Sequence, residues 1–114
     1  PLVTAAACAV VKTMLEKDIP AHAAKIGAYF KEKLAGLKAK YSYVDDVRGQ
    51  GLLLGLGLKI PGGDIVAKCL EKGLLINCTA GTVLRFVPPL IITEAEVDKA
   101  VAILDEVMST VKAE

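Results

Sequence analysis

Apolar residues recur at two different periods along the chain, and the changes of period divide it into elements. Residues 2–17 favour a helix, because alanine, the strongest helix former, is frequent there. Asp18-Ile19-Pro20 interrupts this helix, and Pro20 suits the first turn of a second one. The second helix is predicted over residues 21–40, where apolar residues spaced by three and four positions mark its core side: Ile26, Tyr29, Phe30, Leu34 and Leu37.

The middle of the chain alternates with period two, which is typical of strands. Residues 43–48 predict a short strand that leads into a turn at Gly49-Gln50-Gly51. Residues 52–59 predict a second strand with a buried leucine face and a glycine face that another group can approach closely. After a break at residues 60–63, we expect Asp64 to cap a helix over residues 65–72. Gly73 is a natural end for that helix.

The last third predicts two more strands and a final helix. Residues 74–76 form an apolar strand, residues 77–82 a polar loop and residues 83–87 a strand that ends at Pro88-Pro89. Thr93 and Glu96 have the spacing of a capping box. The helix that follows has an apolar face formed by Val97, Val101, Leu104, Met108 and Val111. This order predicts an α+β fold, a small and mostly antiparallel sheet of about three or four strands with helices packed on it.

Length and charge exclude several classes of function. A chain of 114 residues suits one domain, which we place at 1–114. A net charge of +1 and few aromatic residues argue against nucleic-acid binding, and no apolar run reaches the ~18 residues of a membrane span. The three cysteines and the single histidine, His22, match no zinc pattern, so we expect free thiols and no metal site. Free thiols favour a cytoplasmic protein.

Arg85 is the strongest candidate for binding chemistry. In a strand it shares one face with Val83 and Val87. Either its guanidinium reaches water at an open face of the sheet, or it holds a carboxylate or phosphate through two parallel hydrogen bonds. Asn77 and Thr79, in the neighbouring polar loop, are further candidate substrate ligands.

Other candidate sites are weaker. Gly49-Gln50-Gly51 precedes a strand instead of closing a strand-to-helix turn, so we interpret it as a turn and not as a nucleotide-binding loop. Asp45 and Asp46 are adjacent in a strand and point to opposite faces, which excludes a catalytic dyad. Arg48 suits a surface or salt-bridge role, and Cys78 a structural one. The residues alone therefore indicate a carboxylate-binding or protein-interaction domain that has no catalytic residues.

Several stretches resemble the C-terminal small domain of class III pyridoxal-phosphate-dependent aminotransferases. Residues 1–7 resemble the segment after the family's glycine-rich turn, and residues 47–55 are similar to its first small-domain strand. Residues 75–93 are the strongest match, and their Thr-Ala-Gly loop is most similar to the acetylornithine type. The resemblance implies the C-terminal domain of a fold-type I transferase. Because the chain begins at Pro1, we expect it to continue a larger enzyme.

The resemblance also implies a reaction. Acetylornithine aminotransferases move an amino group from N-acetylornithine to 2-oxoglutarate, forming glutamate, in arginine biosynthesis. Arg85 matches the family arginine that binds the substrate α-carboxylate. The family's Schiff-base lysine, pyridine-binding aspartate and phosphate loop belong to the large domain and have no match here. We therefore expect no catalytic or cofactor-binding residue in this chain, no pyridoxal phosphate bound to it alone, and no activity alone.

The implied partners are the large pyridoxal-phosphate-binding domain of the same enzyme and a second copy in a full-length homodimer. The small-molecule partners are N-acetylornithine, 2-oxoglutarate and glutamate. A domain of this kind should expose an apolar surface toward its large domain, and we expect residues 2–11 to form it. The alternative is a stand-alone, non-catalytic domain that binds carboxylates or another protein.

Overall fold

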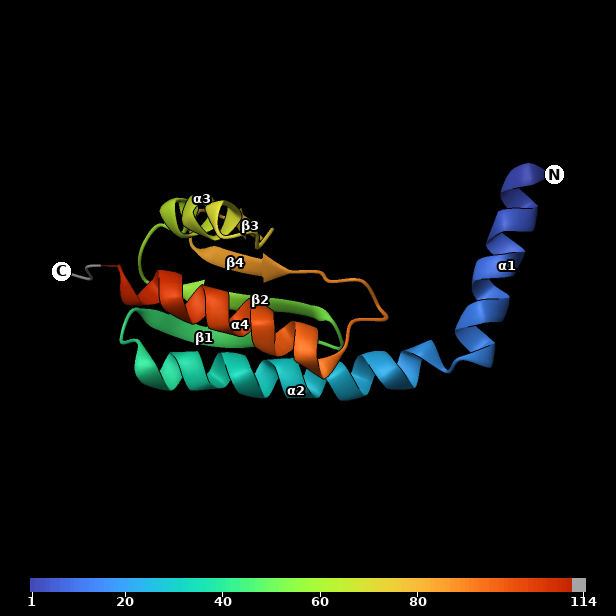
Figure 1. The fold of residues 1–114 in the computed structure, drawn as a ribbon, viewed down its shortest axis with the longest axis horizontal. Helices are drawn as coiled ribbons and strands as arrows, with labels where there is room; N and C mark the ends of the chain where they lie inside the picture. Colours follow the sequence, from blue (N-terminus) through green and yellow to red (C-terminus); the bar gives the residue numbers. More distant parts are fainter. Residues whose placement is uncertain (112–114) are drawn as a thin grey trace.

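The fold is a four-stranded sheet with helices packed against it. A computed structural model describes residues 1–111. In chain order the elements are α1 (Leu2–Glu16), α2 (Ile19–Lys40), β1 (Val44–Gln50), β2 (Leu53–Leu58), α3 (Gly63–Glu71), β3 (Asn77–Thr79), β4 (Val83–Phe86) and α4 (Glu94–Ser109) (Figure 1). The strands pair antiparallel in the order β1-β2-β4-β3. The predicted α+β class is confirmed.

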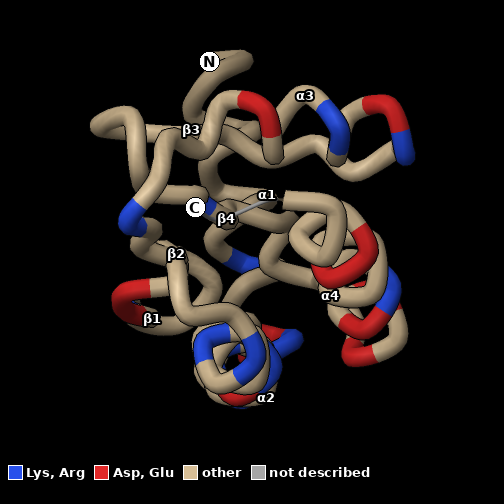
Figure 2. Tube along the Cα trace, turned by 90° about the vertical axis from the view of Figure 1, so that its left-hand side faces the viewer, with Lys and Arg blue, Asp and Glu red and all other residues tan. Residues whose placement is uncertain are grey.

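The core lies between one face of the sheet and the helices. The predicted leucine face is buried, since Leu54, Leu56 and Leu58 lie in the core with Leu84 and Phe86 of β4. Helix α2 packs on β1 and β2, and α4 packs on α2 and α3. Charged residues concentrate on the outer sides of α2 and α4 (Figure 2). Buried residues of α2, α3 and α4 belong to this one core, so these helices lie on the same face of the sheet, and its opposite face is free of helices in residues 1–111.

The predicted strand at residues 74–76 is wrong, because β3 lies instead at Asn77–Thr79, inside the predicted loop. The connection to β4 is very short, and Ala80 and Gly81 both adopt positive φ to make the turn. Pairing continued beyond Asn77 would set residue 74 opposite Pro88, which has no backbone N–H. Pro88 therefore removes the pairing partner of residue 74 and limits how far β3 could extend toward the N-terminus.

Two predicted boundaries also need correction. Asp64 does not cap α3; Gly62 does, and its N–H donates to the Gly81 carbonyl at 2.9 Å. A side chain at residue 62 would lie 2.8 Å from the Cys78 sulfur, so a glycine occupies this cap and Asp64 enters the first turn. The turn expected at residues 49–51 is shorter, because β1 extends through Gln50. The capping box at Thr93 and Glu96 is confirmed.

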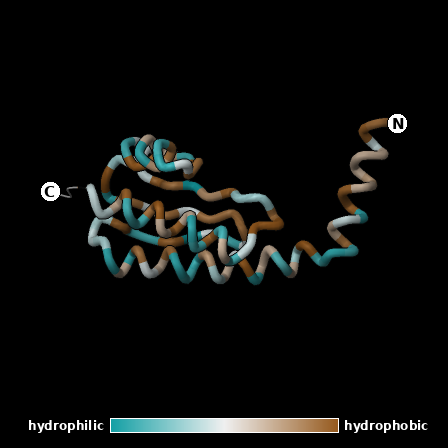
Figure 3. The backbone as a smooth tube through the Cα atoms, viewed as in Figure 1, coloured by the Kyte–Doolittle hydropathy of each residue, from teal (hydrophilic) through white to brown (hydrophobic). Residues whose placement is uncertain are grey.

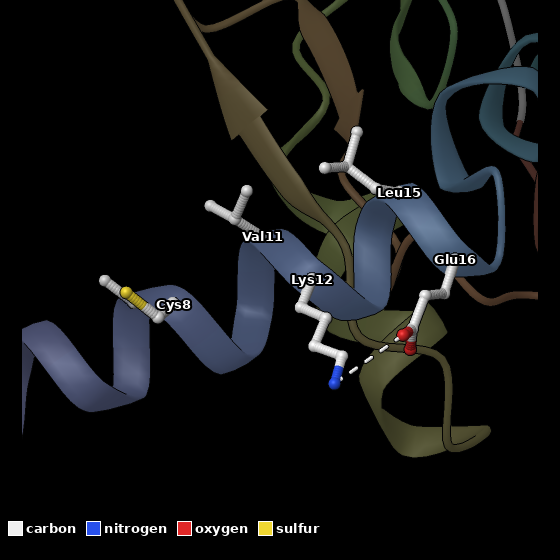
Figure 4. A pocket seen from close by; sticks show the side chains of 6 residues that line it. Cys8, Val11, Lys12, Leu15 and Glu16 are labelled. Carbon is white, nitrogen blue, oxygen red and sulfur yellow. Dashed lines mark ion pairs between the residues drawn. The ribbon is translucent and has the colours of Figure 1, made fainter.

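Helix α1 projects away from the rest of the molecule (Figure 1). None of its residues is buried, and Leu2 and Leu15 are 84% and 76% exposed. Apolar segments follow its length (Figure 3), and one side carries Val11 and Leu15 beside a Lys12–Glu16 ion pair (Figure 4). The expected exposure of the apolar residues 2–11 is confirmed. No helix in residues 1–111 combines the length and apolarity that a bilayer crossing requires.

Substituting alanine for Gly27 and for Gly36, both in α2, should change the free energy of unfolding in opposite directions. A Cβ at Gly27 would collide with the Gly51 carbonyl, whereas nothing lies within 4 Å of a Cβ at Gly36. We expect Gly27→Ala to lower the free energy of unfolding by ~1–3 kcal/mol because of overpacking. Gly36→Ala should raise it by up to ~1 kcal/mol through helix propensity. Urea denaturation of both variants measures this, and equal effects would contradict the close packing of α2 on residue 51.

Candidate functional site

Arg85 emerges on the helix-free face of the sheet. Along β4, Leu84 and Phe86 point into the core while Arg85 is exposed, as the alternation of a strand requires. The predicted orientation is therefore confirmed. Among residues 1–111, no side chain or backbone group forms a hydrogen bond or ion pair with the guanidinium. Its donors are available to a ligand.

The register of the sheet sets the neighbours of Arg85. Its Cα pairs with Gly55 of β2 on one side and with Asn77 of β3 on the other. Directly paired residues of an antiparallel ladder share a face, so Asn77 lies beside Arg85. Thr79 pairs with Val83, one step further along, at a diagonal distance of about 7–8 Å. Asn77 therefore lies closer to Arg85 than Thr79 does.

A shallow hollow adjoins the guanidinium. It has a volume of about 430 Å³ and is lined by Leu75, Ile76, Asn77, Arg85 and Val87. The lining combines one cation and one amide with three apolar side chains. This combination suits a ligand with a carboxylate and an aliphatic body. The sequence interpretation missed Leu75 and Ile76 here because it assigned them to a strand.

The hollow does not fit pyridoxal phosphate. That cofactor is held as a Schiff base to a lysine, with a charged partner at its pyridine nitrogen. Neither a lysine nor a carboxylate is among the residues that line the hollow in the described part of the chain. The residues around Arg85 can hold an anionic ligand, but they do not supply the groups that such a cofactor needs.

Arg48 forms the salt bridge that the sequence indicates. Its Nη1 donates to both carboxylate oxygens of Asp46, at 2.7 and 2.9 Å. Both carboxylate oxygens of Asp46 thus accept hydrogen bonds from Arg48, which agrees with the prediction that Asp45 and Asp46 do not form a catalytic dyad. A β-bulge between Val44 and Asp46 displaces Asp45 from the regular ladder.

Cys69, Cys78 and His22 pack against the core or a neighbouring loop, whereas Cys8 is exposed on α1. All three cysteines are free, as predicted. Cys69 is buried, and burial raises the pKa of its thiol to about 11, whereas Cys78 is half-buried against the core. His22 Nε2 lies 2.9 Å from the Ile92 carbonyl oxygen and ties α2 to the loop before α4. Within residues 1–111 no group of three metal-binding side chains occurs.

Titratable groups on the helix side have a structural role. Asp105 of α4 accepts hydrogen bonds from Lys40 at 2.7 Å and from Tyr41 at 2.6 Å. These bonds lower the pKa of Asp105, and its carboxylate therefore stays ionised and holds α2 to α4. This cluster lies on the far side of the sheet from Arg85, which leaves Arg85 as the centre of the candidate site.

Known proteins match this chain in sequence. The model of the family "Aminotransferase class-III" matches residues 1–108. An acetylornithine aminotransferase of Methanocaldococcus jannaschii is 46% identical over 112 residues, covering 98% of this chain and 28% of that protein. One from Aquifex aeolicus is 52% identical over 100 residues, covering 87% and 25%. The chain thus spans about a quarter of the length of these relatives.

Solved structures match it in fold. The acetylornithine aminotransferase of Elizabethkingia anophelis has a TM-score of 0.89 at 28% identity, over 96% of this chain and 28% of that one. The ornithine aminotransferase of Toxoplasma gondii, which carries pyridoxal phosphate at partial occupancy in its active site, has a TM-score of 0.86 at 31% identity, over 95% and 26%. By sequence and by fold, this chain belongs to the aminotransferase class-III family.

Proposed function

We propose that residues 1–114 are the C-terminal small domain of a pyridoxal-phosphate-dependent aminotransferase of the acetylornithine type. Within it, Arg85 binds the substrate carboxylate. One observation carries the proposal: the Arg85 guanidinium stands on the open sheet face, unpaired within residues 1–111, in a hollow shared with Asn77 and apolar side chains. The names of the relatives support the substrate class.

The role of Arg85 follows from its chemistry. A guanidinium forms two parallel hydrogen bonds to a carboxylate and so fixes both its position and its orientation. N-acetylornithine, 2-oxoglutarate and glutamate all carry a carboxylate, which makes one clamp useful in both halves of the transfer. Asn77, paired with Arg85 across the ladder, adds an amide donor, and Thr79 is a more distant candidate. Fixing the substrate in this way lowers the entropic part of the barrier.

The chemical step belongs to the rest of the enzyme. Pyridoxal phosphate supplies the electron sink for amino transfer when it is bound. Because the chain spans only about a quarter of its relatives, and the Arg85 hollow has no lysine among its lining residues, we place the cofactor on a large domain outside the residues described. The exposed apolar residues of α1, including Leu2, Val3 and Val11, support a contact with that domain. A homodimeric complete enzyme and a cytoplasmic location are part of the same proposal.

The isolated chain tests this division of roles. We expect the purified 114-residue chain, mixed with pyridoxal phosphate, to show neither an aldimine absorbance band nor turnover of N-acetylornithine. Circular dichroism of the same sample establishes that the chain is folded. Transamination by this chain alone would contradict the proposal. The coding sequence upstream of Pro1 separates the alternatives: a large domain with a strand-end lysine favours the enzyme, and a start codon favours the stand-alone domain.

A further inference from the structure

Arg48 lies on the same row of the sheet as Arg85. The Cα of Arg48 pairs with Gly55, and Gly55 pairs with Arg85. Paired residues share a face, so both arginines stand on the open face of the sheet with only a glycine between them. Two strand spacings separate their Cα atoms by about 10 Å. A ligand with two carboxylates, such as 2-oxoglutarate, is short enough to lie between two arginine side chains at this separation.

Gly55 contributes no side chain to the row between the two arginines. The nearest atoms to a Cβ built at residue 55 would be Val83 Cγ1 at 3.3 Å, Arg48 Cγ at 3.7 Å and the Leu84 carbonyl oxygen at 4.0 Å, so the glycine lets these neighbouring side chains approach. The aliphatic stem of Arg48 therefore already leans over the glycine. Its guanidinium, however, turns back along its own strand to the Asp46 carboxylate, at 2.7 and 2.9 Å.

Gly57 provides the place for that carboxylate. Asp46 pairs with Gly57, and a Cβ at residue 57 would collide with Asp46 Oδ1. The missing side chain thus lets Asp46 lie flat on the sheet, where it meets Arg48. The pair is partly exposed, with 59% of the Arg48 side chain and 36% of the Asp46 side chain accessible. An exposed ion pair of this kind contributes little to stability, so its loss leaves the fold intact.

We propose that Asp46 is a specificity-determining positioning residue. By holding the Arg48 guanidinium, it leaves Arg85 as the unpaired arginine of the row and neutralises the second positive charge. The site then presents one cation to a ligand, and a second carboxylate gains no partner of its own on this sheet. This inference rests on the proposed role of Arg85. It adds a reason why N-acetylornithine, with one carboxylate, can compete for the site with 2-oxoglutarate and glutamate, which have two.

Asp46→Asn in the complete enzyme tests the inference. Releasing Arg48 should lower KM for the dicarboxylates 2-oxoglutarate and glutamate about two- to tenfold, given the Coulomb energy at this separation. KM for N-acetylornithine, which has one carboxylate, should change less than about twofold. Adding Arg48→Gln to Asp46→Asn should return the KM for 2-oxoglutarate and glutamate to the value of the unchanged enzyme. Asp45→Asn, a neighbouring exposed carboxylate, is the matched control and should change neither KM.

The outcomes separate this inference from the proposed function. Equal changes of KM for mono- and dicarboxylates, no change for either, or a gain that persists after Arg48→Gln would each overturn the role of Asp46. If Arg85→Lys raises KM for both substrates in the same assays, the carboxylate site stands even when the Asp46 inference fails. If Arg85→Lys leaves both KM values unchanged, the proposed function itself is wrong.

Discussion

Arg85→Lys in the complete enzyme should reduce kcat/KM for both N-acetylornithine and glutamate by about 10- to 100-fold, mainly through higher KM. Lysine keeps the positive charge but offers a single ammonium in place of a planar fork. The carboxylate then loses one of two charge-assisted hydrogen bonds, each worth ~1.5–3 kcal/mol. Steady-state kinetics with each substrate varied in turn measures both values.

A reciprocal exchange provides the control for Arg85→Lys. Lys25 of α2 pairs with Glu94 on the helix side of the sheet. Lys25→Arg changes one cation for another far from the Arg85 hollow, so both KM values should be unchanged. Loss of activity in both variants, or in neither, would argue against a carboxylate site at Arg85.

Among the substitutions considered for stability, Leu84→Ala should lower the free energy of unfolding most. Leu84 is 0% exposed and precedes Arg85 on β4, so it supports the strand that carries the candidate site. Truncating a fully buried leucine leaves a cavity and costs ~2–5 kcal/mol, a large part of the ~5–15 kcal/mol typical of a folded domain. Urea denaturation of the chain, followed by circular dichroism, measures the difference.

Leu75 offers the same substitution at an exposed position. It is 82% accessible, so Leu75→Ala should change the free energy of unfolding by no more than ~0.5 kcal/mol. Similar losses for Leu84→Ala and Leu75→Ala would mean that β4 does not cover the core as described. A large loss for Leu84→Ala alone supports the placement of the Arg85 strand.

Local patterns predicted most of the fold. The leucines of β2 alternate with glycines, and the buried face follows directly from that period. Thr93 and Glu96 cap α4 through contacts three residues apart, which a sequence contains in full. The error at residues 74–76 arose because their apolar character suits a strand, while Pro88, distant in sequence, leaves residue 74 without a backbone N–H opposite it.

The candidate site was only partly predictable. Alternation along β4 placed Arg85 opposite the core side, but its neighbours depend on pairing between strands. Gly55 lies 30 positions before Arg85 in the sequence, and only the register shows that they meet. The same holds for Asp46 over Gly57. The direction of α1 likewise follows from the short connection at Lys17 and Asp18, where Asp18 adopts a φ of 47°.

A crystal structure of the complete enzyme with bound glutamate tests the role of Arg85 most directly. We predict that the two oxygens of one glutamate carboxylate lie about 2.7–2.9 Å from two guanidinium nitrogens of Arg85, in a parallel bidentate pair. A glutamate whose carboxylates both bind elsewhere, with Arg85 left to solvent or to another protein group, would contradict the carboxylate site.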